Sequence, residues 1–95
     1  RLSTNRIIRP SNTAKDVILE TRDDAERVIE ALREAAERYG HVTVGDMYEV
    51  VGIEPVSTDH EWGWQLRDLM AAHVKLIDAG EYLVSMPRPI AIATR

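Results

Sequence analysis

Between residues 25 and 39, apolar residues recur at the spacing of three and four positions that places them on one face of a helix, while charged residues fill most of the other positions. The apolar stripe consists of Ala25, Val28, Ile29, Leu32, Ala36 and Tyr39. Gly40 follows the last apolar position, and a glycine there is typical of a helix end. The pattern predicts a long helix that ends at Tyr39 or Gly40.

The beginning of this helix is open to two interpretations. Thr13 with Asp16 and Thr21 with Asp24 both resemble capping boxes, in which a threonine is followed three residues later by an acid. Several apolar residues before Thr21 also fall near the stripe. We predict a helix over about Lys15–Tyr39, with an interruption around Thr21 as the alternative.

A second, shorter helix is predicted after the glycine. The segment His41–Thr43 is rich in β-formers and predicts a short strand. Thr43 and Asp46 then have the spacing of an N-terminal cap. This cap predicts a two-turn helix over about Val44–Val51, closed by Gly52.

The linker that follows contains Pro55, which breaks regular structure. After it, Thr58 and Glu61 have the spacing of a capping box and precede several apolar residues. We predict a third helix over about Asp59–Ala71, weakened in its first turns by Gly63.

The two tryptophans lie within this predicted helix. Residues two positions apart on a helix point in directions about 200° apart, so Trp62 and Trp64 cannot share one buried stripe unless the backbone leaves the helix at Gly63. Trp62 is in register with Leu66 and Leu69, so we expect it in the core. Trp64 is then either a cap over the following hairpin or an exposed anchor.

From His73 onward the pattern changes from helical to alternating. The runs "HVKLI" and "YLVSM" are separated by "DAGE", which predicts an antiparallel hairpin turning at Asp78–Glu81. The "PRP" sequence at 87–89 cannot continue a ladder and is expected to end the sheet.

The predicted order is long helix, short strand, short helix, third helix and hairpin, which is a winged-helix arrangement. We therefore predict an α+β fold: a small winged-helix-like domain with three helices and a β-hairpin wing over residues 14–90, an extended arm over 1–13 and a tail over 91–95. The third helix takes the place of a recognition helix. The predicted core is Val28, Ile29, Leu32, Ala36, Met47, Val50, Val51, Trp62, Leu66, Leu69, Val74, Leu76, Leu83 and Val84.

The formal charge of −4 is distributed unevenly. Residues 1–15 carry four bases and no acid, whereas Asp16–Gly40 and His41–Arg95 each carry eight acids against four bases. The chain thus reads as a basic arm on an acidic body. The arm has few apolar residues, so we expect it to be extended, to pack little on its own domain and to order on a partner. Its expected contacts are Arg6, Ile7, Ile8 and Arg9.

No motif for catalysis or cofactor binding is present in the sequence. There is no cysteine, nucleotide-binding loop or nucleophile motif. His41, His60 and His73 have no partner at the spacing that places two metal ligands on one helix face. The sequence predicts a protein that is not an enzyme and that has no cofactor and no metal, and its short apolar runs predict no membrane span.

The predicted recognition helix is acidic. Its one cation is Arg67, and the predicted wing offers Lys75 beside Asp78 and Glu81, so this surface would repel a phosphate backbone. We expect a protein partner instead, bound through Arg6, Ile7, Ile8, Arg9, Asp59, Glu61, Trp64 and Asp68. The alternative is DNA binding, led by the arm, through Arg1, Arg6, Arg9, Arg67 and Lys75.

Three segments, "VTVGDMYEVVGI", "TDHEWGW" and "GEYLVSMPRP", resemble in order and spacing a group of small proteins encoded by tailed phages of actinobacteria. The resemblance covers about residues 16–90 and implies a phage origin without implying an activity. One departure is Glu81, which stands between Gly80 and Tyr82, and "VKLID" replaces more basic residues before this strand. The departure removes charge that a DNA-binding wing would need.

The resulting expectation is a non-enzymatic, phage-encoded module for protein binding and assembly, in the virion as a minor structural component or in the host cytoplasm, with the option of several copies in one assembly. Its partner is a phage structural protein or a host protein. A DNA-binding regulator and an inhibitor of a host protein are the alternatives.

Overall fold

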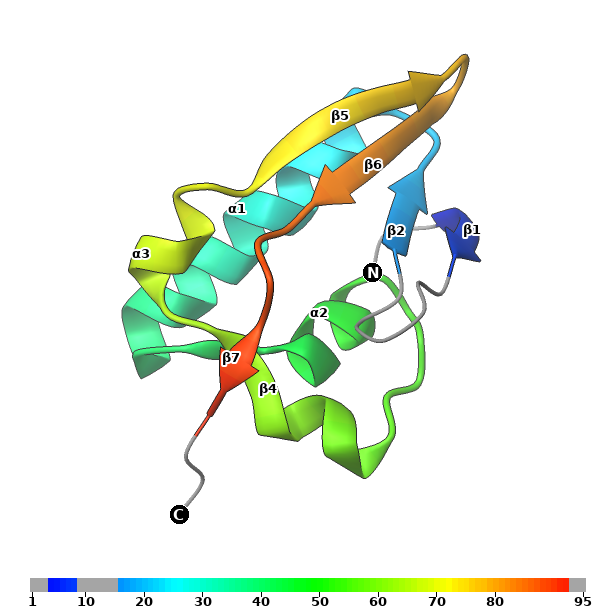
Figure 1. The fold of residues 1–95 in the computed structure, drawn as a ribbon. Helices are drawn as coiled ribbons and strands as arrows, with labels where there is room; N and C mark the ends of the chain where they lie inside the picture. The colour runs from blue at the N-terminus through cyan, green and yellow to red at the C-terminus, as the bar shows by residue number, and fades with distance from the viewer. Residues whose placement is uncertain (1–3, 9–15, 93–95) are drawn as a thin grey trace.

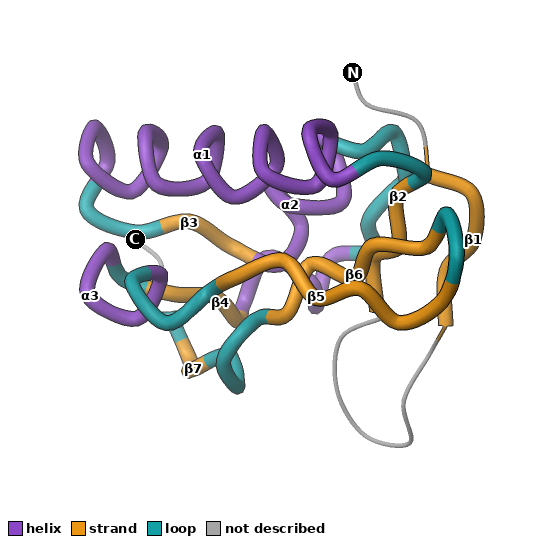
Figure 2. The backbone as a smooth tube through the Cα atoms, turned by 90° about the horizontal axis from the view of Figure 1, so that it is seen from above, coloured by secondary structure: helices purple, strands orange, loops and turns teal. Residues whose placement is uncertain are grey.

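The computed structural model describes residues 4–8 and 16–92, and this part of the chain folds as an α+β protein. Its helices α1, α2 and α3 are combined with two antiparallel sheets (Figure 1). Viewed from above, α1 forms one layer, and the strands lie together on one side of this helix (Figure 2). The predictions for Arg1, Arg9 and residues 93–95 fall outside the described residues.

The long helix α1 spans Arg22–Tyr39 and has the predicted apolar face. The Thr21 side chain accepts a hydrogen bond from the Asp24 backbone N–H at 3.0 Å and so begins the helix. Gly40 ends it with φ of 89°, a left-handed conformation that only glycine adopts without strain. Of the two candidate caps, Thr21 with Asp24 is the one that begins the helix. The buried face consists of Ala25, Val28, Ile29, Leu32 and Ala36.

Residues before Thr21 form a strand instead of the predicted first turns of the helix. Strand β2 spans Asp16–Leu19 and pairs with another strand on each side. Its three apolar residues are all fully buried, which places Val17 and Leu19 in the core beside α1. The prediction of a helix from Lys15 was wrong because a central strand of the sheet buries more of each of these side chains than the end of a helix would.

The hairpin is confirmed, and it belongs to a larger sheet than predicted. Strands β5 (His73–Asp78) and β6 (Glu81–Ser85) turn at the predicted residues, with Gly80 at φ of 73°. Strand β1 (Thr4–Ile8) and β2 complete the order β1-β2-β6-β5, and α1 packs on this sheet. The predicted arm is thus extended, but its backbone pairs with β2, so the expectation that it packs little on its own domain was wrong.

A second sheet holds the segments that follow α1. It has the order β3-β4-β7, with β3 at Val42–Thr43, β4 at Trp62–Trp64 and β7 at Ile90–Ala91. Ala91, the first residue of the predicted tail at 91–95, is extended and pairs with Trp62. Helix α2, Val44–Val50, follows β3 and begins at the predicted capping box of Thr43 and Asp46.

The single third helix predicted over Asp59–Ala71 was wrong. The segment contains a 3₁₀ helix, η1 (Ser57–Glu61), then strand β4, then the one-turn helix α3 (Leu66–Leu69). At Gly63 the backbone approaches β3 so closely that a Cβ would collide with the Val42 carbonyl oxygen. This close pairing requires glycine and extended backbone, and it removes the recognition helix.

Most of the predicted core is present. Fully buried are Val28, Ile29, Leu32, Ala36, Met47, Val51, Leu69 and Val84. Val50, Leu66 and Val74 are partly buried against this cluster, and Leu83 is half-buried. The prediction that Trp62 and Leu76 lie in the core was wrong, since 48% and 54% of their surfaces are exposed. Leu76 lies toward the end of the hairpin, which extends beyond α1 (Figure 1).

Candidate protein-binding surface

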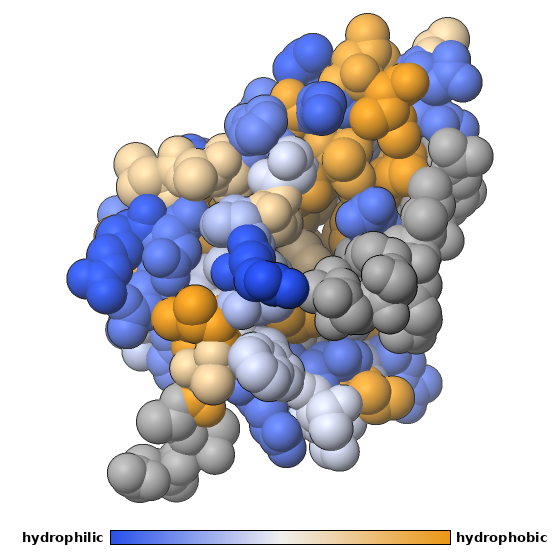
Figure 3. Space-filling view, in the orientation of Figure 1, coloured by the Kyte–Doolittle hydropathy of each residue, from blue (hydrophilic) through white to orange (hydrophobic). Residues whose placement is uncertain are grey.

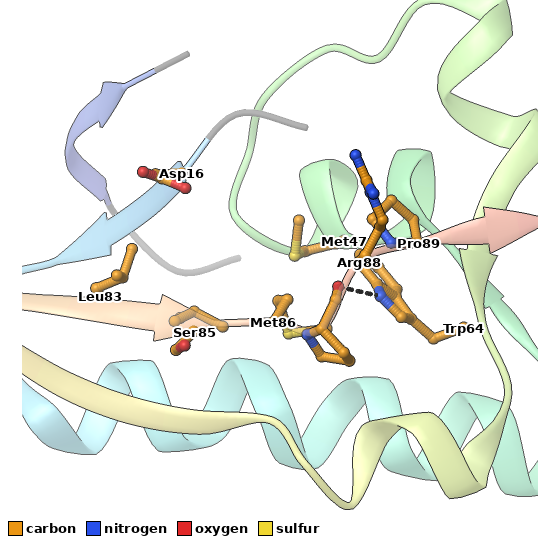
Figure 4. Close-up of a pocket in the computed structure, with 10 residues that line it drawn as sticks. Asp16, Met47, Trp64, Leu83, Ser85, Met86, Arg88 and Pro89 are labelled. Carbon is orange, nitrogen blue, oxygen red and sulfur yellow. Dashed lines mark hydrogen bonds between the residues drawn. The ribbon is translucent and has the colours of Figure 1, made fainter. Parts of the chain in front are cut away.

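The prediction that Trp62 lies in the core was wrong, and Trp64, for which a cap over the hairpin and an exposed anchor were the two alternatives, is buried. Trp64 is 1% exposed and is the largest buried side chain of the described residues. Its indole Nε1–H donates a hydrogen bond of 2.8 Å to the carbonyl oxygen of Pro87, in the segment that follows the hairpin (Figure 4). Trp64 therefore stabilises the fold and cannot be an exposed anchor for a partner.

Trp62 is the exposed tryptophan, and it lies on a strand that is held on both sides. Gly63 pairs with Thr43 of β3, and Trp62 pairs with Ala91 of β7. The next backbone N–H, that of Ile92, donates a hydrogen bond to the Glu61 carbonyl oxygen at 2.8 Å. The backbone around Trp62 is thus fixed, so little backbone entropy would be lost when a partner covers this indole.

We define the Trp62 surface as the exposed side chains of Glu61, Trp62 and Ala91. Cross-strand neighbours share one face of a sheet, so Trp62 and Ala91 lie together. Ile90, the other β7 residue, pairs with Gly63 and is 42% exposed. Figure 3 shows apolar surface over β7, apart from the larger apolar area over the hairpin. An apolar side chain beside a carboxylate makes this surface suitable for a protein partner with cations around an apolar pocket.

His60, in η1 just before the strand that carries Trp62, contacts helix α2 and its cap residue Thr43. Its ring Nδ1 lies 3.1 Å from Thr43 Oγ1 and 4.0 Å from a carboxylate oxygen of Asp46. The ring also packs directly on Gly45, where a Cβ would collide with it. These contacts fix η1, and with it the beginning of β4. His60 therefore positions Trp62, a role that its place in the sequence did not reveal.

The three acids predicted to bind a partner differ in what they do. Asp59 accepts a hydrogen bond from the Val56 backbone N–H, and Asp68 accepts one from the Gln65 backbone N–H, each at 2.9 Å. Both carboxylates thus cap short helical turns. Of the three, Glu61 is the one that is exposed and that immediately precedes Trp62 in the chain.

The charge of the described body disfavours contact with phosphate. Residues 16–92 contain sixteen acids and seven bases, a formal charge of −9. Arg27 pairs with Asp23 at 3.2 Å, and Arg33 donates hydrogen bonds to the carbonyl oxygens of Leu69 and Ala72. These two arginines are therefore engaged in the fold.

The bases of the alternative nucleic-acid site are not gathered on one element. Arg67 lies on α3 and Lys75 on β5, and both are exposed. Arg6 lies in β1, at the other edge of the sheet from β5. These three bases therefore lie on separate elements, whereas a phosphate backbone is bound by bases gathered along one surface.

A second apolar area lies on β5, where Leu76 and Ile77 are exposed. β5 is an edge strand, and exposed edges invite pairing with another chain. The ladder between β5 and β6 is irregular between Leu76 and Asp78, and Lys75 adds a charge. Both features disfavour edge pairing, which makes this area less suited to a partner than the surface around Trp62.

No protein-family model matches the chain, and neither a curated protein nor a solved structure matches it. Among residues 4–8 and 16–92, no group of three or more histidines and acids is placed to hold a metal ion. No helix in the same part of the chain is long and apolar enough to cross a membrane. The assignment of the Trp62 surface as the candidate binding site follows from its geometry and charge.

Proposed function

We propose that the chain is a non-enzymatic protein-binding module that acts in the assembly of a phage particle, and that it binds its partner through the Trp62 surface. The observation that carries the proposal is the half-exposed Trp62 on a backbone fixed by β3 and β7. Tryptophan is enriched among the residues that dominate binding energy at protein interfaces. A rigid tryptophan loses little freedom when it enters a pocket.

The charge of the body supports a basic partner. Its formal charge of −9 over residues 16–92 raises the encounter rate with a cationic surface and lowers it with a phosphate backbone. Glu61 is exposed, immediately precedes Trp62 in the chain and would form part of the rim of the interface. The proposed partner surface is an apolar pocket surrounded by lysines or arginines.

We also propose that the chain has a phage origin and a relationship to winged-helix domains. The resemblance of the "TDHEWGW" and "GEYLVSMPRP" segments to actinobacterial phage proteins supports the origin. The order of α1, β3, α2 and the β5–β6 hairpin supports a winged-helix-like ancestry. The position of the recognition helix is occupied by β4 and the one-turn α3, which is unsuited to entering a major groove.

The proposal can be tested by photo-crosslinking from the position of the indole. In cells that produce the phage, p-benzoylphenylalanine replaces Trp62, which keeps an aromatic side chain at the site. The matched control carries the same residue in place of Met70. This methionine directly follows α3 in the chain and is 65% exposed. We expect one discrete crosslinked phage protein from position 62 and a much weaker product from position 70. Equal products from both positions, or none from 62, would refute the Trp62 surface.

A further inference from the structure

A pocket of about 330 Å³ opens between the two sheets. Its volume is at the lower end of the range of about 300–1,000 Å³ that is usual for ligand sites. It is bounded by the beginning of β2, the end of β6, the 86–89 segment, α2 and β4 (Figure 4). The segment 86–89 leads directly into β7, so the pocket adjoins the Trp62 surface along the chain.

The floor of the pocket is apolar and combines one rigid side chain with two adaptable ones. Trp64 is held by its hydrogen bond to Pro87. Met47 and Met86 line the same space from α2 and from the segment after β6. Methionine is unbranched and polarizable, so it adapts its shape to different apolar groups. Such a floor suits one apolar side chain of leucine or phenylalanine size.

The rim carries two opposite charges. Asp16 lies at the β2 side, and Arg88 extends away from the floor on the other side (Figure 4). Within the described part of the chain, Arg88 forms no ion pair with any side chain. Its guanidinium is therefore available to a carboxylate that arrives with the ligand.

We propose that this pocket receives one apolar side chain of a partner protein segment, and that Arg88 binds a carboxylate next to that side chain in the segment. The inference rests on the proposed protein-binding function, and it adds a second contact with its own specificity. The Trp62 surface inserts an indole into the partner, whereas the pocket accepts a side chain from the partner. The two contacts together would fix the orientation of the complex.

The three methionines provide a test by NMR. Met47 and Met86 line the pocket. Met70 is exposed to solvent and does not line the pocket. The protein is labelled with ¹³C at the methionine methyl groups and with ¹⁵N at the indoles. It is titrated with the peptide acetyl-Gly-Leu-Glu-Gly-amide to millimolar concentration. Acetyl-Gly-Ser-Glu-Gly-amide controls for the apolar group, and acetyl-Gly-Leu-Gln-Gly-amide controls for the charge.

We expect saturable shifts of the Met47 and Met86 methyl signals and of the Trp64 indole with the leucine peptide, and none with the serine peptide. The Met70 methyl and the Trp62 indole should stay unchanged. The glutamine peptide should bind about three- to fivefold more weakly, as expected when one exposed ion pair is lost. In Arg88→Gln, the glutamate and glutamine peptides should bind equally, because only the shared leucine contact remains.

Two results would overturn the inference. One is the absence of saturable shifts at Met47 and Met86, and the other is an equal response of Met70. A glutamate preference that persists in Arg88→Gln would refute the role of Arg88 while the apolar contact stands. The crosslink from position 62 is independent of these signals, so failure of the pocket and failure of the Trp62 surface can be told apart.

Discussion

Replacing each tryptophan in turn separates the buried indole from the exposed one. Trp64→Ala removes a side chain that is 1% exposed and that donates a hydrogen bond to Pro87. Loss of a buried tryptophan costs about 3–5 kcal/mol, and the unpaired carbonyl adds up to about 1 kcal/mol. For a domain whose total stability is on the order of 5–15 kcal/mol, this change leaves the folded state barely populated or lost.

Trp64→Phe is the informative intermediate, because it keeps an aromatic ring in the core. We expect a loss of about 1–3 kcal/mol from the missing hydrogen bond and the smaller ring. Trp62→Phe and Trp62→Ala should each cost less than about 1 kcal/mol, since the indole is half-exposed. Urea unfolding followed by far-UV circular dichroism measures all of these variants. If Trp62→Ala destabilises the protein as much as Trp64→Ala does, the assignment of the two environments is wrong.

Three further outcomes are expected. Gly63→Ala should cost more than about 2 kcal/mol in urea unfolding, because its Cβ would collide with backbone of β3; a loss below about 0.5 kcal/mol would contradict the close pairing. Glu61→Lys should slow association with a crosslinked partner in surface plasmon resonance, while the same change at an exposed glutamate of α1 should slow it less. Duplex DNA should bind at low salt alone, with loss of binding in a salt series and when Arg1, Arg6 and Arg9 are replaced by glutamine; tight, site-selective binding that survives these replacements would restore the DNA-binding alternative.

Features set by short-range chemistry were predictable from the sequence. The α1 end at Gly40 and the α2 cap at Thr43 and Asp46 depend on residues within four positions of one another. The hairpin turn also depends on a local signal, the glycine between two alternating runs. In each of these places the local preference and the final structure agree.

The errors fall where distant residues decide the structure. Residues Asp16–Leu19 fit a helical stripe, but they pair with β1 and β6, and β6 lies more than sixty residues further along the chain. Residues Trp62–Trp64 follow a good capping box, but they pair with β3 and β7. A helical pattern in one segment does not show that a strand elsewhere will bury the same residues better.

The wrong prediction for Trp62 follows from the second of these errors. On a helix, Trp62 would be in register with Leu66 and Leu69. On strand β4, Trp64 is buried in the core, and Trp62, the first residue of the strand, is half-exposed. Gly63 was the available signal, since a glycine between two large residues marks a close approach of backbones. Arg88 and Met86 gave no sequence signal of the pocket, because its lining comes from four separate segments of the chain.

The content of purified phage particles tests the proposed assembly role most directly. Particles are prepared from phage that encode the unchanged chain, Trp62→Ala or Met70→Ala, and the copy number of the chain per particle is measured by quantitative mass spectrometry. Both replaced side chains are exposed, so both variants should fold. We expect a constant copy number for the unchanged chain and for Met70→Ala, and a loss of at least tenfold for Trp62→Ala, equivalent to about 1.4 kcal/mol of binding. Absence of the unchanged chain from the particles, or an equal content of all three chains, would contradict it.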